Sequence, residues 1–74
     1  MMALGIPEAI AEVAKLLTKV FGYTVDPSGL ATLKRENQLK LIMRGIDEAI
    51  AKNEWAACDA LFAQYERLRI ETGP

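Results

Sequence analysis

Acidic side chains in the second half of the chain are the first candidates for chemistry. Four of them follow one another closely: Asp47, Glu48, Glu54 and Asp59. Paired carboxylates can bind a metal ion or divide the roles of general acid and base. Asp47 and Glu48 are adjacent, so on a helix their side chains point about 100° apart. The sequence also lacks the EF-hand loop pattern. We interpret these acids as solvated surface residues and expect neither a metal nor a cofactor.

The nucleophiles are equally sparse. The chain has one cysteine, Cys58, and no histidine. These counts exclude a Cys/His zinc site, an intramolecular disulfide and any catalytic triad that needs imidazole. Cys58 shares an apolar helical face with Trp55 and Phe62, which predicts a buried, unreactive thiol. The glycines form no phosphate-binding fingerprint. We therefore expect a protein that is not an enzyme and takes no small-molecule substrate.

Nucleic-acid chemistry is the remaining possibility. Trp55, Phe62 and Tyr65 could stack on bases, but they lie in the acidic part of the chain and their spacing predicts core packing. As a recognition helix, residues 54–71 would meet phosphates with acids and alanines. Weak, salt-sensitive binding through Lys34, Lys40 and Arg44 stays open as the alternative function.

Composition limits the rest. The chain has 74 residues, of which 51% are hydrophobic and 26% charged, which indicates one small folded domain over residues 1–74. Its net charge of −1 does not favour nucleic acid or an anionic membrane. There is no basic, apolar leader and no run of about 18 apolar residues. We expect a soluble cytoplasmic protein.

Hydrophobic periodicity predicts an all-α fold of three helices, at about residues 6–21, 27–51 and 54–71. Gly22 is a stop signal for the first helix, and Asp26–Pro27 is a start signal for the second. Asn53 is the predicted N-cap of the third. The short break at residues 52–53 makes the last two helices an antiparallel hairpin within a three-helix bundle. Stop signals at residues 72–74 end the chain.

The second predicted helix is apolar on two sides. One face is expected to pack on the other two helices and consists of Leu39, Ile42, Met43, Ile46, Ala49 and Ile50. A second stripe combines Leu30, Leu33, Asn37 and Leu41. Either the flanking helices cover both sides and the protein is a monomeric bundle, or the stripe pairs with another chain. We favour the second possibility.

Charge is segregated although the total is near zero. Residues 28–46 carry a net charge of +3 and residues 47–74 a net charge of −3. Opposite zones on one small surface favour self-association or an acidic partner. The predicted interaction surface is therefore the second stripe with its flanking cations: Leu30, Leu33, Asn37, Leu41, Lys34, Lys40 and Arg44. The expected partner is a second copy, in a homo-oligomer, or another protein.

The run from Ala49 to Phe62 pairs a short Asn53–Glu54–Trp55 break with an alanine-rich helix that continues into Tyr65–Glu66–Arg67–Leu68. This pattern resembles the helical hairpin of small all-helical phage and prophage accessory proteins of uncharacterised function. The resemblance covers about a third of the chain and implies a phage or prophage origin, without supplying functional residues. Tetratricopeptide hairpins share some of this texture, but no Leu-Gly follows Trp55.

Overall fold

A computed structural model describes residues 5–71 of the chain, and within them every regular element is a helix. The helices are α1 (Glu8–Phe21), α2 (Pro27–Ala31), α3 (Arg35–Ala51) and α4 (Trp55–Glu71). The prediction of an all-α protein is confirmed. The three-helix bundle is not, because the described part of the chain forms four helices. The stop signals predicted at residues 72–74 lie outside the described residues.

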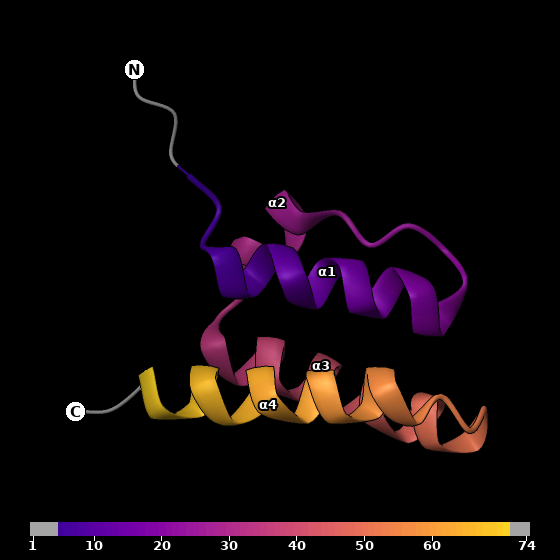
Figure 1. The fold of residues 1–74 in the computed structure, drawn as a ribbon. Coiled ribbons are helices and arrows are strands. Elements are labelled where there is room, and N and C mark those ends of the chain that lie inside the picture. The colour runs from indigo at the N-terminus through magenta and orange to yellow at the C-terminus, as the bar shows by residue number, and fades with distance from the viewer. Residues whose placement is uncertain (1–4, 72–74) are drawn as a thin grey trace.

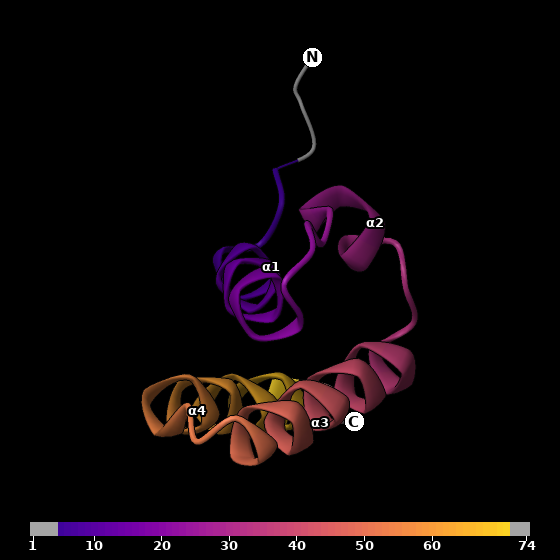
Figure 2. The same cartoon turned by 90° about the vertical axis from the view of Figure 1, so that its right-hand side faces the viewer.

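The helices form two layers. In Figures 1 and 2, α3 and α4 lie side by side as an antiparallel pair, while α1 and α2 lie over the same face of that pair. The core between the layers includes Ile10, Val13 and Leu17 of α1, each no more than 1% exposed. Ile42 of α3 and Leu61 of α4, both fully buried, meet them from the hairpin. The hairpin is therefore covered by other helices on one face.

The ends of α1 follow simple backbone rules. The helix begins after Pro7, so Ile6 lies before it, exposed, rather than in its first turn as predicted. It ends at Gly22, whose φ of 82° lies in the left-handed region and whose amide donates to Thr18 O. The backbone amide of Val25 then donates to Thr18 Oγ1 at 2.8 Å, which folds the following segment back along α1.

The prediction of one long second helix over residues 27–51 was wrong, because the chain turns between α2 and α3. Asp26 caps α2 as predicted, accepting from the Ser28 amide. The Thr32 hydroxyl donates to Gly29 O at 2.7 Å, and Lys34 is extended. A glycine and a β-branched residue are both weak helix formers, and here the threonine side chain binds the backbone locally. Gln38 Nε2 completes the turn by donating to Leu30 O at 2.9 Å.

The turn between α3 and α4 also differs from prediction. Asn53 has φ 58° and its amide donates to Ile50 O, so it terminates α3 rather than capping the next helix. Glu54 O accepts the first bond of α4, from the Cys58 amide. Asparagine tolerates the left-handed conformation that this tight reversal needs.

Close contact between the layers depends on Gly45. A Cβ atom at this position would collide with Leu17 of α1 and would lie 3.2 Å from Leu61 Cδ1 of α4. The glycine thus leaves room for the two leucines, both fully buried, where three helices meet. Glycine costs about 1 kcal/mol against alanine within a helix, and the packing of Leu17 compensates for that cost.

We expect Gly45→Ala to lower the free energy of unfolding by about 1 kcal/mol, because overpacking outweighs the gain in helix propensity. Urea denaturation followed by circular dichroism measures the change. In a Leu17→Ala background the space is free, so the same substitution should become neutral or stabilising. An increase in stability in the wild-type background would contradict the close approach.

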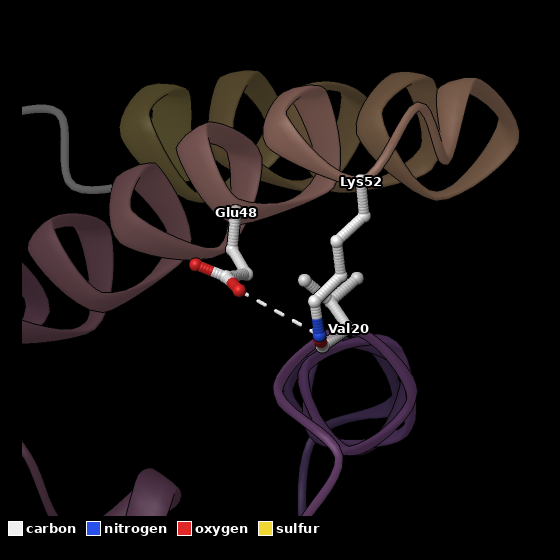
Figure 3. Close-up of polar contacts among 3 residues, drawn as sticks. All are labelled: Val20, Glu48 and Lys52. Atoms are coloured by element: carbon white, nitrogen blue, oxygen red, sulfur yellow. Dashed lines mark hydrogen bonds and ion pairs between the residues drawn. The ribbon is translucent and has the colours of Figure 1, made fainter.

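Lys52 joins the hairpin turn to the end of α1 (Figure 3). Its Nζ donates to Val20 O at 2.5 Å and lies 3.6 Å from Glu48 Oε2. The last carbonyls of a helix lack partners within the helix and carry partial negative charge, which an ammonium group neutralises. Lys52 thus caps α1 from another helix and shows which side of α3 faces α1.

Lys52→Met keeps the aliphatic stem but removes the ammonium, and should lower the free energy of unfolding by about 1 kcal/mol. Lys19→Met is the matched control, since Lys19 is an exposed cation in the last turn of α1. It should change stability by less than about 0.5 kcal/mol. Equal losses in thermal or urea denaturation would show that the bond to Val20 contributes nothing.

Candidate interaction surface

The residues of the predicted stripe do not form one surface. Leu30 is only 3% exposed and belongs to the core, because the turn after α2 directs it inward. Leu41 is half-buried and packs against the core, whereas Leu33, in the turn, is 39% exposed. The polar members are all exposed: Asn37, Lys34, Lys40 and Arg44. Binding of a partner by these exposed residues stays a prediction.

A different set of large apolar residues is exposed on α3. Met43 is 38% and Ile50 45% exposed, although both were predicted to pack on the other helices. Met43 lies two residues before Gly45, and Ile50 lies two residues before Lys52. Both Gly45 and Lys52 face α1. Two residues along a helix correspond to about 200° of rotation. Met43 and Ile50 therefore lie on the side of α3 that faces away from α1.

Helix α4 has the same arrangement. Trp55 is 56% and Phe62 51% exposed, although both were predicted to be core residues. Phe62 follows the buried Leu61, as Met43 follows the buried Ile42. The two helices are antiparallel, and α1 covers one side of both. The step of one residue from Leu61 to Phe62 and from Ile42 to Met43 therefore leads from the covered side toward the same uncovered side. We call this set the outer face: Met43, Ile50, Trp55 and Phe62.

Contacts across the hairpin fix which residues lie at the same level. The Glu54 amide donates to Ala49 O at the turn, and Arg35 Nη1 donates to Leu68 O at 3.1 Å near the open end. Between them, Gly45 lies beside Leu61. This register places Ile50 level with Trp55 and Met43 level with Phe62. The outer face is thus two apolar pairs separated by about two helical turns.

Charged side chains surround these pairs. Asp47 and Asp59 lie between them, and Glu36, Lys40, Glu66 and Arg69 lie toward the open end. Arg69 Nη2 donates to Glu66 Oε1 at 2.7 Å, and this bond raises the pKa of Arg69 above its ordinary value. The outer face thus combines two apolar pairs with charged side chains that lie between and beyond them, and such charges can select a partner by complementarity.

Side chains that could do chemistry are sparse among the residues that the structure describes. Within residues 5–71 no three potential metal-ligating side chains come together. Cys58, predicted to be a buried thiol, is half-buried and packs against the core. Two hollows of about 230 and 400 Å³ lie beside α2, and Lys15 is the one ionisable side chain among their described linings. A single cation supplies no acid–base pair.

The signal that could have located the outer face lies in α4. Its first ten residues carry apolar or small side chains on nearly every side, including Trp55, Leu61 and Phe62. Such a helix has more apolar surface than one contact face can bury. Periodicity placed Trp55, Phe62 and Tyr65 together in the core, although α1 and α3 cover only part of that side of α4.

Comparison of the chain with known protein families, curated proteins and solved structures finds no match. The site is therefore interpreted from its own residues. Within the described residues, no helix has the length and apolar character required to cross a membrane.

Proposed function

We propose that this protein is a non-enzymatic interaction or assembly module that self-associates through the outer face of its α3–α4 hairpin. The observation that supports the proposal is the grouping of four large, partly exposed apolar side chains on the side of the hairpin that faces away from α1. Several large apolar side chains exposed on one side of a small domain are characteristic of an interface.

The area is sufficient for a second copy. Trp55 at 56% and Phe62 at 51% exposed each contribute roughly 100 Å² of accessible surface. With Met43 and Ile50 the outer face offers roughly 350 Å² of apolar surface, at the scale of functional patches. Two copies together would bury roughly 1,100 Å² when their polar borders are included, close to the lower limit for a specific complex.

Multi-angle light scattering over a hundredfold concentration range should give a mass above the 8.2 kDa of the monomer for the wild type. Phe62→Asp should return that mass to the monomer value, because an aspartate at the interface must be desolvated without a partner. Helicity should persist, since the Phe62 side chain is half exposed.

Leu33→Asp is the matched control, because Leu33 is an exposed leucine outside the outer face. It should leave the mass unchanged. A wild type that stays monomeric at every concentration contradicts self-association. Dissociation by Leu33→Asp but not by Phe62→Asp would assign the interface to the turn between α2 and α3.

The second candidate function is binding of nucleic acid through the basic part of α3. The observation in its favour is that Lys34, Lys40 and Arg44 are all exposed. It predicts retention of a DNA or RNA probe that weakens steeply with added salt. Combined Lys40→Glu and Arg44→Glu should abolish retention, whereas Lys19→Glu on α1 should preserve most of it. Salt-independent or absent retention excludes this function.

A phage or prophage origin stays a prediction from the resemblance of the hairpin at residues 49–68. An assembly role would be consistent with such an origin.

A further inference from the structure

The outer face carries a pattern of charge that distinguishes between ways of pairing two copies. We call residues of α3 and α4 that lie side by side across the hairpin a level. From the turn to the open end, the five levels are Ile50 with Trp55, Asp47 with Asp59, Met43 with Phe62, Lys40 with Glu66 and Glu36 with Arg69. Two levels are apolar, two combine opposite charges and one combines like charges. The two helices therefore complement each other along most of their length.

A two-fold axis that runs along the hairpin would use this complementarity. It places each α3 residue opposite the α4 residue of its own level in the second copy. Ile50 then meets Trp55, Met43 meets Phe62 and Lys40 meets Glu66. Asp47 and Asp59 form the one unfavourable level of the five. Every facing pair of helices is antiparallel in this arrangement, as in many four-helix bundles.

A two-fold axis that runs across the hairpin fits less well. Centred on Met43 and Phe62, it exchanges the turn with the open end and places Ile50 opposite Glu36. It sets Asp47 against Lys40, which is favourable, but it also sets the acids Asp59 and Glu66 against each other. Centred nearer the turn, it joins the apolar pairs but leaves the open half of the hairpin without a contact.

Building on the proposed function, we propose that the occupant of the outer face is a second copy related by a two-fold axis along the hairpin, with each α3 lying on the partner's α4. The dimer is a four-helix layer pair, with α1 and α2 of each copy on the outside. Lys40 of one copy pairs with Glu66 of the other, twice per dimer.

Asp47→Lys tests the axis through the sign of its effect. If the two-fold axis runs along the hairpin, the new lysine meets Asp59 of the second copy. The dissociation constant of the dimer then falls roughly tenfold, because repulsion becomes attraction at two symmetric contacts. If the axis instead runs across the hairpin and is centred on Met43 and Phe62, the lysine meets Lys40 of the second copy and the dissociation constant rises. Sedimentation equilibrium on the full chain measures the constant. A weakened dimer overturns the proposed axis.

A charge exchange provides the second test. Lys40→Glu should raise the dissociation constant about tenfold, and adding Glu66→Lys should restore it. Glu66→Lys alone separates the two axes by the sign of its effect. If the axis runs along the hairpin, the new lysine meets Lys40 and the dissociation constant rises; if the axis runs across it, the lysine meets Asp59 and the constant falls. Both shifts should shrink in 1 M salt because of screening. Circular dichroism confirms that each variant keeps its helicity.

The outcomes separate the two proposals. A wild type that does not associate removes the proposed function itself. A wild type that dimerises and is dissociated by Phe62→Asp, but whose dissociation constant rises with Asp47→Lys and falls with Glu66→Lys, retains that function and overturns only the axis.

Discussion

The packing of Leu17 against Gly45 determines which surfaces of this protein are buried. Leu17 occupies the space that a Cβ at position 45 would fill, so α1 lies directly against the hairpin on that side. Lys52 holds the other end of the same contact by binding Val20 O. Because α1 and α2 both lie on this side, no other helix of the described residues covers the opposite side of α3 and α4 (Figure 2). The position of one glycine thus separates core from candidate interface.

Local signals predicted those parts of the fold that local chemistry determines. Asp26 with Pro27 starts a helix and Gly22 ends one, because each acts on backbone groups within a few residues. The turn after α2 was not predicted, since it depends on a long-range contact as well as on Thr32. The Gln38 side chain donates a hydrogen bond to Leu30 O across that turn, and the change of chain direction there buries Leu30 in the core. A continuous helix over these residues would have kept Leu30 in the predicted stripe.

The candidate site was harder to predict than the helices. The sequence predicted surplus apolar surface at Leu30 and Leu41, whereas the structure exposes Trp55 and Phe62 instead. Periodicity identifies which residues share a helical face and says nothing about which face a neighbouring helix covers. Leu61 and Phe62 are adjacent and equally apolar, yet one is fully buried and the other 51% exposed. Only the position of α1 distinguishes them.

Different residues of α4 form the core and the outer face, so folding of the monomer and the proposed association depend on different side chains. A domain of this length buries a modest fraction of its surface, so the proposed contacts with a second copy would add substantially to its stability. The groups responsible differ, however. Leu61 contributes to the monomer's own core, whereas about half of the Phe62 surface is exposed and available to the proposed complex. Substitutions on the outer face can therefore change association while the fold persists, and those facing α1 act on the fold itself.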